Sequence, residues 1–384
     1  GMANRTLRWR TDLDKPVITT NFEKRGWIQA EDDEWNVYWT ASVRQFFGVD
    51  CFYRLSDAQV VNHFPNHYEL TRKDLMVKNL TRYRRELERS GQSSRDASFV
   101  PTSYTLPTEM MLFQEDFRRR PNTLWIMKPS AKARGVGIFM VSKLSQVRQW
   151  MAVKGNAQLT GKECFVISQY IERPLLIGGR KFDLRLYVLV TSYSPLVAYK
   201  YEKGFARFCT ARYTLSRESL ENRYAHLTNV SVQCKSEDYN EEHGGKWSTT
   251  NLRLYLQATV GHEGTERLWK DMDSVIVTSL KAVQPVIQND RHCFECYGYD
   301  ILIDGNLKPW LIEVNASPSL SATTSSDFTL KADLIDDVLK IVAPKGFPQV
   351  NKTNVGPKGW QGGAFTPLID ESGKHLPPWW GDNN

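Results

Sequence analysis

Three oxygen-bearing side chains, Asp300, Glu313 and Asn315, lie in two runs that are otherwise strongly apolar. Gly305-Asn306 separates the two runs, a pattern that predicts a β-hairpin. The expected register puts Asp300 opposite Leu311 and makes Asp300 and Glu313 diagonal neighbours, with all three polar side chains on one face. Two carboxylates and an amide oxygen suit Mg²⁺, which prefers hard oxygen ligands and keeps positions open for substrate phosphates. The competing interpretation is a set of exposed polar residues on half-buried strands.

A second polar set lies at the start of the strand-like run at 182–190. Alternation along a strand places Lys181, Asp183 and Arg185 on one face and apolar side chains on the other. Two cations that flank an anion can meet a polyanion and a ribose hydroxyl or a metal-bound water. A charge ladder on the protein surface is the competing interpretation.

A loop between the strand-like runs at 124–128 and 138–141 has the composition of a phosphate-binding loop. Lys128 ends the first run, and the loop then carries Arg134 and Gly135. Glycine lets the backbone approach phosphates closely, and lysine neutralises their charge. The sequence lacks both the Walker A pattern and the dinucleotide fingerprint here. By itself the loop indicates phosphate binding and does not identify the ligand.

The strand-like run at 165–170 leads into a possible base-binding edge. Backbone groups of Tyr170 and Ile171, together with the Gln169 amide, can recognise an adenine, although a buried strand explains the run equally well. Four further polar residues stand in aromatic or glycine-rich settings, where each can hold a small carboxylate substrate or be structural: Arg207, Thr228, Asn229 and Lys246.

A basic helix is predicted directly after residue 70. The segment Thr71–Asp74 fits a capping box, and the helix then runs to about residue 89. Its apolar face has helical spacing and consists of Met76, Leu80, Tyr83 and Leu87. A basic stripe faces away from the core and consists of Lys78, Arg82, Arg85 and Arg89. The stripe is either a solvated surface or a docking face for an acidic partner.

The remaining elements predict a mixed α/β protein with several subdomains. A short strand is expected at 17–20, a long helix at about 265–289, and another helix from Asp333 to just before Pro344. Residues 344–384 are rich in Gly and Pro, so we expect an irregular tail there. The expected units are an N-terminal subdomain at 1–65, a central one at 66–173 and a C-terminal one at 174–343.

Composition limits the function classes without choosing one. The 384 residues carry a net charge of +7, which suits an acidic partner such as nucleic acid, an anionic membrane surface or an acidic protein. The six Cys are scattered, and the lone Cys293-x-x-Cys296 pair is a poor zinc site, so buried reduced thiols are expected. No apolar run reaches the roughly 18 residues of a membrane span. We therefore expect a cytosolic or cytoskeletal protein.

Taken in order, these segments resemble the tubulin tyrosine ligase-like family over about residues 1–343. The resemblance is carried by four long blocks: Asn62–Lys78, Ile177–Tyr187, His292–Asp300 and Trp310–Pro318. It implies an ATP-grasp fold in which the nucleotide lies between the central and C-terminal subdomains. Within the family the blocks look most like the polyglutamylase branch, whose members are expected to work with partner subunits in a complex.

The resemblance also implies a role for each candidate residue. Lys128 and the Arg134-Gly135 loop would contact ATP phosphates. Gln169, Tyr170 and Ile171 would hold adenine. Lys181 and Asp183 would bind the nucleotide, and Arg185 would line the catalytic centre with Lys128. Asp300, Glu313 and Asn315 would bind Mg²⁺. Arg207, Thr228, Asn229 and Lys246 would bind the incoming free glutamate.

The implied activity is ATP-dependent addition of glutamate to γ-carboxylates of acidic tubulin tails through an acyl phosphate. The implied location is the cytoplasm and cytoskeleton, including the axoneme or basal body of a cilium or flagellum. Three alternatives stay open: a tubulin ligase for tyrosine or glycine, a non-catalytic microtubule-binding subunit, and a nucleic-acid-binding protein. The last has no recognised motif in the sequence, so neither nucleic acid nor a membrane is the expected partner.

Overall fold

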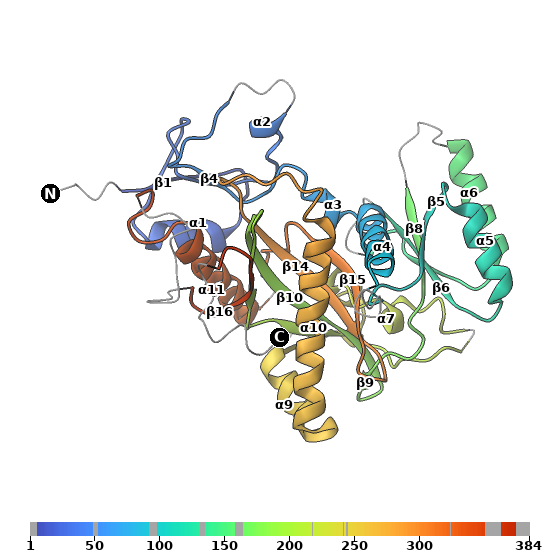
Figure 1. Cartoon of the computed structure of the whole chain (residues 1–384). Helices are drawn as coiled ribbons and strands as arrows, with labels where there is room; N and C mark the ends of the chain where they lie inside the picture. Colours follow the sequence, from blue (N-terminus) through green and yellow to red (C-terminus); the bar gives the residue numbers. More distant parts are fainter. Residues whose placement is uncertain are drawn as a thin grey trace.

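The computed structural model of the chain describes residues 6–48, 53–91, 98–130, 135–157, 164–216, 218–240, 242, 245–322, 324–349 and 362–373. In these residues the chain forms a mixed α/β structure with three sheets, of four, eight and four strands. Figure 1 shows the eight-stranded sheet in the middle, with the other two sheets on either side. Among the described residues, no helix is both long and apolar enough to cross a membrane.

The N-terminal sheet is parallel and has the strand order β2-β1-β3-β4. Its strands are β1 (Arg8–Thr11), β2 (Ile28–Gln29), β3 (Val37–Trp39) and β4 (Val60–Val61), with the helices α1 (Pro16–Lys24) and α2 (Arg44–Phe47). The predicted strand at 17–20 is wrong, because this segment lies in α1. Pro16 occupies the first turn, and Val17, Ile18 and Phe22 are buried, so burial on one face of a helix overrides the strand propensity of β-branched residues.

The central sheet is antiparallel and has the order β5-β8-β6-β7. Its strands are β5 (Ser103–Leu106), β6 (Trp125–Pro129), β7 (Phe139–Val141) and β8 (Phe165–Gln169). The last three agree with the predicted runs, whereas β5 was not predicted. The helices α5 (Met110–Arg119) and α6 (Leu144–Ala157) cover one face, as Figure 1 shows. Phe113, Trp125 and Ile167 are fully buried in the core between them.

The eight-stranded sheet is built around the long strand β10 (Arg180–Tyr193). Its other strands are β9 (Leu176–Ile177), β11 (Leu196–Tyr201), β12 (Phe205–Phe208), β13 (Lys246–Ser248), β14 (Glu295–Ile303), β15 (Pro309–Asn315) and β16 (Phe365–Asp370). The strand β16 corrects the expectation of an irregular tail for these residues. It pairs with β11, and Phe365 is buried against Tyr201, so apolar packing orders this part of the tail.

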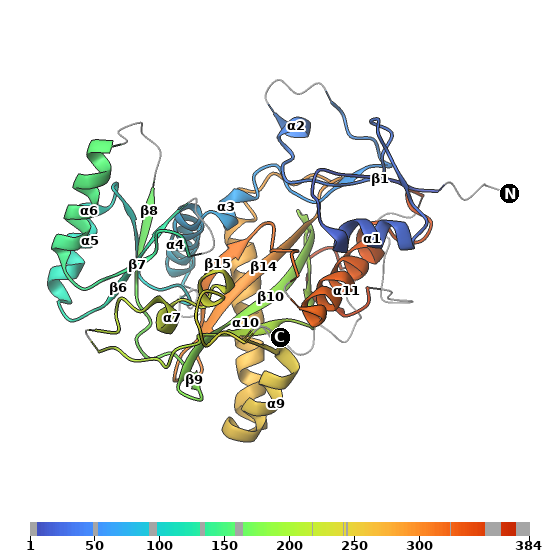
Figure 2. The same cartoon turned by 180° about the vertical axis from the view of Figure 1, so that it is seen from behind.

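Helices cover both faces of this sheet. The helices α9 (Thr249–Val260) and α10 (His262–Val283) lie on one face, and α11 (Ser325–Val342) packs with α1 on the other (Figures 1 and 2). The long helix predicted at 265–289 is therefore confirmed in type. The last predicted helix begins earlier than Asp333, because the Thr324 hydroxyl accepts a bond from the Asp327 amide and caps α11 there.

The basic helix is present as α4 (Lys73–Arg89), after the short α3 (Tyr68–Thr71). The predicted capping box does not form: Thr71 ends α3, its hydroxyl donates to the His67 carbonyl, and Asp74 binds Arg72. Met76 and Leu80 are buried as expected. Three residues of the predicted basic stripe, Lys78, Arg85 and Arg89, are exposed.

Candidate active site

The alternation of β10 separates an apolar face from a polar one. Phe182, Leu184, Leu186 and Val188 join the core under α10. On the opposite face, Tyr187 and Leu189 pack toward α11, while the earlier odd positions are Lys181, Asp183 and Arg185. The predicted alternation is therefore confirmed. The polar residues are nevertheless buried, which excludes a charge ladder on the protein surface.

Asp300 lies at the centre of this polar face, with Arg185 opposite on β10 and Glu313 opposite on β15. The predicted register, with Leu311 opposite Asp300, is wrong. The β14–β15 pairing shifts between Asp300 and Ile301, and Leu311 pairs with Ile301 instead. The shift brings the two carboxylate-bearing residues directly opposite each other, closer than the expected diagonal arrangement.

Two guanidinium groups hold the buried Asp300 carboxylate. Arg185 binds it through Nε at 2.6 Å and Nη2 at 3.1 Å, and Arg207 binds it through Nη2 at 2.8 Å. Burial alone would raise the pKa of Asp300, but the two arginines outweigh burial and hold that pKa well below its usual range. Asp300 is therefore a permanent carboxylate at neutral pH.

Arg207 also binds Asp183, its partner across β10 and β12, at 2.8 and 2.6 Å. The Thr228 hydroxyl donates to the same carboxylate at 2.7 Å. Two residues assigned by resemblance to glutamate, Arg207 and Thr228, thus share a buried network with two residues assigned to nucleotide and metal. The same carboxylates that hold Arg207 in place also neutralise it.

Lys246 extends the network by one strand, because it is the cross-strand partner of Arg207. Its ammonium lies 3.3 Å from Asp327 and 4.9 Å from the ring centre of Phe205. Lys331 binds the same Oδ2 of Asp327 at 2.9 Å. Burial lowers the pKa of Lys246, and Asp327 opposes that effect. Lys246 and Lys331 therefore both pair with the Asp327 carboxylate of α11.

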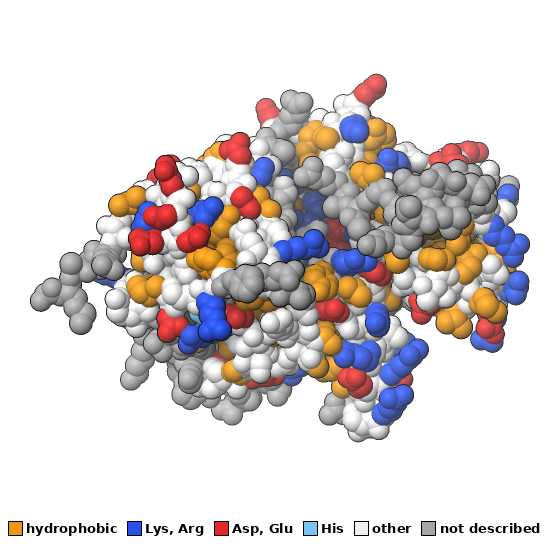
Figure 3. All heavy atoms as spheres, turned by 90° about the horizontal axis from the view of Figure 1, so that it is seen from above, with side chains coloured by type: hydrophobic (Ala, Val, Ile, Leu, Met, Phe, Trp, Pro, Cys, Tyr) orange, Lys and Arg blue, Asp and Glu red, His pale blue; other side chains and the backbone are white. Residues whose placement is uncertain are grey.

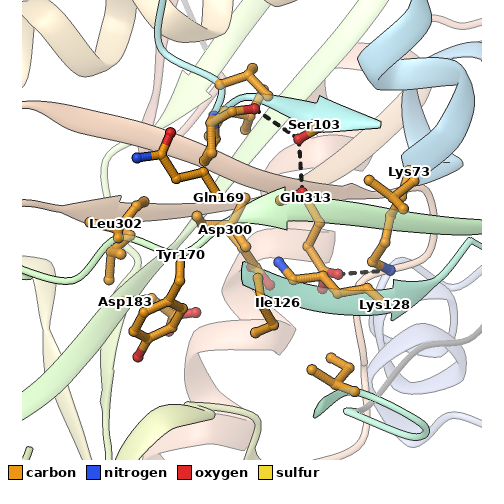
Figure 4. A pocket seen from close by; sticks show the side chains of 18 of the residues that line it. Lys73, Ser103, Ile126, Lys128, Gln169, Tyr170, Asp183, Asp300, Leu302 and Glu313 are labelled. Carbon is orange, nitrogen blue, oxygen red and sulfur yellow. Dashed lines mark hydrogen bonds and ion pairs between the residues drawn. The ribbon is translucent and has the colours of Figure 1, made fainter. Parts of the chain in front are cut away.

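Glu313 is balanced by lysines from two other elements. Lys73, the first residue of α4, lies 3.0 Å from Glu313. Lys128, near the end of β6, lies beside Glu313 in the pocket (Figure 4). Burial lowers the pKa of Lys128 to about 8, while Glu313 partly restores the charged form. Asn315 completes this edge, since its amide nitrogen lies 3.3 Å from Glu313.

A pocket between the central sheet and the eight-stranded sheet brings most of the predicted residues together. Its lining includes Lys128, Gln169, Tyr170, Ile171, Lys181, Asp183, Thr228, Asn229, Asp300 and Glu313. Arg185, Arg207, Lys246 and Asn315 lie on the sheet next to this lining. Apolar side chains such as Ile126 and Leu302 form the opposing walls (Figure 4). The pocket thus has an apolar slot that leads to a charged floor, the arrangement expected for a base and its phosphates.

Lys181 closes the floor below Tyr170. Its ammonium donates to the Tyr170 hydroxyl at 3.0 Å and to the His226 carbonyl at 2.9 Å, and it lies 4.6 Å from the centre of the Tyr170 ring. Burial lowers the pKa of Lys181 and raises the pKa of Tyr170. The lysine is therefore fixed by the protein at the point where the apolar slot meets the charged floor.

Of the predicted phosphate loop, Arg134 lies outside the described residues, whereas Gly135 is placed. Its φ is +72°, and a Cβ there would lie 3.0 Å from Val232 and 3.1 Å from Asn229. Arg223 also donates to its carbonyl at 2.5 Å. These contacts hold the end of the loop against the short helices α7 (Arg223–His226) and α8 (Val230–Gln233) and explain why glycine is needed.

The oxygen donors fit a magnesium ion. Among the described residues, no three His, Cys, Asp or Glu side chains gather as a metal-binding group. Asp300, Glu313 and Asn315 supply two carboxylates and an amide on neighbouring strands at the pocket, which is the kind of incomplete oxygen set that Mg²⁺ accepts together with phosphates. The buried charge of Asp300 is consistent with such a site.

Sequence reasoning missed Lys73, Asp327 and Lys331. Lys73 lies in the predicted capping box, and only folding brings it to Glu313. Asp327 and Lys331 lie on α11, and the predicted start of that helix at Asp333 excluded both residues. The sequence signal that could have found Lys73 is its place in the block Asn62–Lys78.

Similarity to known proteins indicates the family of this chain. The sequence matches the tubulin-tyrosine ligase family over residues 53–350. It is 49% identical over 360 residues to the probable alpha-tubulin polyglutamylase Ttll1 of Tetrahymena thermophila, covering 89% of this chain and 87% of that protein. It is 43% identical over 371 residues to the probable tubulin polyglutamylase TTLL9 of Bos taurus, covering 88% and 79%. The chain therefore belongs to the tubulin-tyrosine ligase family.

Proposed function

We propose that this chain is a tubulin polyglutamylase, an ATP-dependent ligase that joins free glutamate to γ-carboxylates of tubulin C-terminal tails. The observation that carries the proposal is the buried set of Asp183, Arg185, Arg207 and Asp300, with the half-buried Glu313, beside an apolar slot, in a chain 49% identical to a probable alpha-tubulin polyglutamylase. Charged groups are rarely buried at such density for stability alone, since their desolvation is costly.

ATP would bind between the central and C-terminal subdomains of an ATP-grasp arrangement. Gln169, Tyr170 and Ile171 line the slot for adenine, and Lys181 lies where the slot meets the charged floor. Lys128 provides positive charge for the phosphates, as would Arg134. The subdomain boundaries at residues 65, 173 and 343 are part of the same proposal.

Asp300, Glu313 and Asn315 would hold magnesium, which would offset the negative charge of the phosphates. The chain's own cations do the rest. Lys128 and Arg185 orient the γ-phosphate toward the acceptor carboxylate and stabilise the charge that develops during transfer. The buried floor excludes water, which would otherwise hydrolyse an activated carboxylate.

The chemistry proceeds in two balanced steps. An acceptor carboxylate oxygen attacks the γ-phosphorus, the bond to the β-phosphate oxygen breaks, and an acyl phosphate and ADP form. The neutral amine of free glutamate then attacks the acyl carbon, inorganic phosphate leaves, and the amine proton is released. Activation is needed because a free carboxylate is a poor electrophile.

Glutamate would bind at the end of the network formed by Arg207, Thr228, Asn229 and Lys246. Two cations there favour a substrate with two carboxylates over tyrosine or glycine. The structure engages Arg207 with Asp183 and Asp300, so Lys246 is the cation nearer the end of the network. Changing Lys246 to Ala is expected to raise the KM for glutamate, and an unchanged KM would remove this argument.

The acceptor is a chain of acidic residues, and the basic side chains of α4 suit it. Lys78, Arg85 and Arg89 are exposed on that helix, and Figure 3 shows Lys and Arg side chains near a hollow on one face of the molecule. Such charge raises the encounter rate with an acidic tail. Action on microtubules of the cytoskeleton, including those of a cilium or flagellum, and partner subunits in a complex are part of this proposal.

Mass spectrometry of tubulin tests the proposal. Tubulin is incubated with the chain, ATP, Mg²⁺ and one amino acid at a time: glutamate, tyrosine or glycine. The proposal predicts mass increments of glutamate alone. Mass increments of tyrosine or glycine would instead support a tubulin ligase for that amino acid. Microtubule binding without an increment, even after addition of partner subunits, would favour a non-catalytic subunit.

A further inference from the structure

The cluster Arg118-Arg119-Arg120 ends α5, and only its last member turns into the protein. Arg119 is exposed and pairs with Glu115, which is also exposed. Arg120 is half-buried, and its guanidinium lies 5.4 Å from the centre of the Trp125 ring. Arg120 therefore differs from its two exposed neighbours, and of the three it is the one that binds Gln169, a residue of the pocket lining.

The planar guanidinium of Arg120 donates hydrogen bonds to two residues at once. Its Nε donates to Asp116 at 2.8 Å, Nη2 binds the other oxygen of the same carboxylate, and Nη1 donates to Oε1 of Gln169 at 2.9 Å. The Tyr104 hydroxyl donates to the oxygen of Asp116 that Nη2 binds, at 2.7 Å. The hydrogen bond from Arg120 holds the pKa of Asp116 below its usual range, so this carboxylate is charged and orients the arginine.

This arrangement fixes which end of the Gln169 amide faces Arg120. A guanidinium has donors only, so it can bind the amide oxygen and not the amide nitrogen. The backbone of Gln169 is also held in place. Gln169 pairs with Trp125 in the sheet, and its backbone N–H donates to the Thr102 carbonyl. With Oε1 engaged, the group that Gln169 retains for a ligand is its N–H₂ donor.

We propose that Arg120 is a positioning residue for nucleotide binding, which holds the Gln169 amide so that the pocket offers a donor to an acceptor atom of the base. This inference rests on the proposed binding of ATP in the slot. Without Arg120, the amide can rotate and present its oxygen, which repels the acceptor nitrogens of a purine. The expected consequence is weaker ATP binding with little change in the chemical step.

The test is a double-mutant cycle read out as KM for ATP and kcat. Arg120→Ala is expected to raise the KM for ATP about fivefold, in keeping with one misdirected hydrogen bond, while kcat stays near wild type. Gln169→Ala is expected to raise the KM similarly. In the Gln169→Ala background, Arg120→Ala should change the KM by less than about twofold, because the amide that Arg120 positions is gone.

Two further variants separate positioning from folding. Arg120→Lys keeps a positive charge beside Asp116 but lacks the fork that binds Asp116 and Gln169 together. It is expected to melt near wild type and still raise the KM. Arg119→Ala, the matched control, should leave both the KM and the melting temperature unchanged because its ion pair is exposed.

Direct titration of the wild-type chain with ATP and Mg²⁺ keeps the two proposals distinguishable. If the wild type binds no ATP, the proposed function fails. If it binds ATP but Arg120→Ala raises the KM equally with and without Gln169, only the positioning role of Arg120 is overturned. A KM unchanged in both Arg120 variants would overturn it as well.

Discussion

Asp300 and Glu313 lie directly opposite each other on β14 and β15, yet each carboxylate is balanced by cations from different parts of the chain. Asp300 is held by Arg185 and Arg207 from the same sheet. Glu313 is held by Lys73, from the start of α4. The two carboxylates thus join the eight-stranded sheet to a helix beside the central sheet. This junction is where the proposed metal, the phosphates and the acceptor would meet.

Replacing Arg207 with Leu should destabilise the protein strongly. The change leaves Asp183 without its two-point partner and removes one of two guanidinium groups from Asp300, both in a buried setting. Breaking a buried ion pair in this way costs about 3 to 5 kcal/mol. Urea unfolding followed by circular dichroism measures the change. The control is Lys203→Leu, whose exposed pair with Asp333 should cost at most about 1 kcal/mol. Equal losses for the two variants would contradict the assigned role of Arg207.

The free energy of unfolding should depend on pH through His63, which binds Glu295. This buried ring lies 2.6 Å from Glu295 of β14 and 3.2 Å from Asn62, with the His67 ring 4.8 Å away. Burial lowers the pKa of His63, but Glu295 outweighs burial and raises it above the ordinary value. The folded protein therefore binds a proton more tightly than the unfolded chain does.

The sign of the effect follows from that difference. The stabilising contribution of His63 is fully present below the ordinary pKa of histidine, and it is lost as pH rises through the raised pKa of the folded state. Urea unfolding at a series of pH values should show this decline, and His63→Gln should remove it. His262→Gln, at the exposed start of α10, should keep the wild-type profile. A His63→Gln profile parallel to wild type would refute the assignment.

Gly135→Ala should impair ATP binding. The left-handed backbone at this position costs any other residue about 1 to 2 kcal/mol, and the new Cβ would press on Asn229 and Val232. Gly26→Ala is a matched control, since Gly26 has φ +68° but open space around it. Both variants should lose stability, and only Gly135→Ala should raise the KM for ATP. Equal KM values in the two variants would show that the contact with α8 does not position the loop.

Strand periodicity made much of the site predictable. The alternation of Lys181, Asp183 and Arg185 with apolar residues needs only the period of two, and both the strand and the polar face are present. The same periodicity predicted that one hairpin carries Asp300, Glu313 and Asn315. The turn residues could not predict the pairing shift beside Asp300. Local pattern therefore identified which residues share a face.

Local sequence patterns could not predict the contacts between residues that are far apart in the chain. Lys73 reaches Glu313 only because α4 packs beside the pocket, and no spacing in the sequence relates the two residues. The burial of α1 overrode the strand propensity of Val17 and Ile18. Likewise, β16 forms because part of a Gly- and Pro-rich segment pairs with the edge strand β11. In each case tertiary packing decided what local propensity left open.

Glu313→Gln tests the proposed magnesium site, with glutamate incorporation into tubulin measured by mass spectrometry. The change keeps the shape of the side chain but removes one of the two carboxylates proposed to hold magnesium. We predict that incorporation falls by about a hundredfold or more, because metal stabilisation of the transferring phosphate is worth several kcal/mol. Melting temperature and tubulin binding should stay close to wild type. Incorporation at the wild-type rate would show that Glu313 holds no metal needed for glutamate ligation.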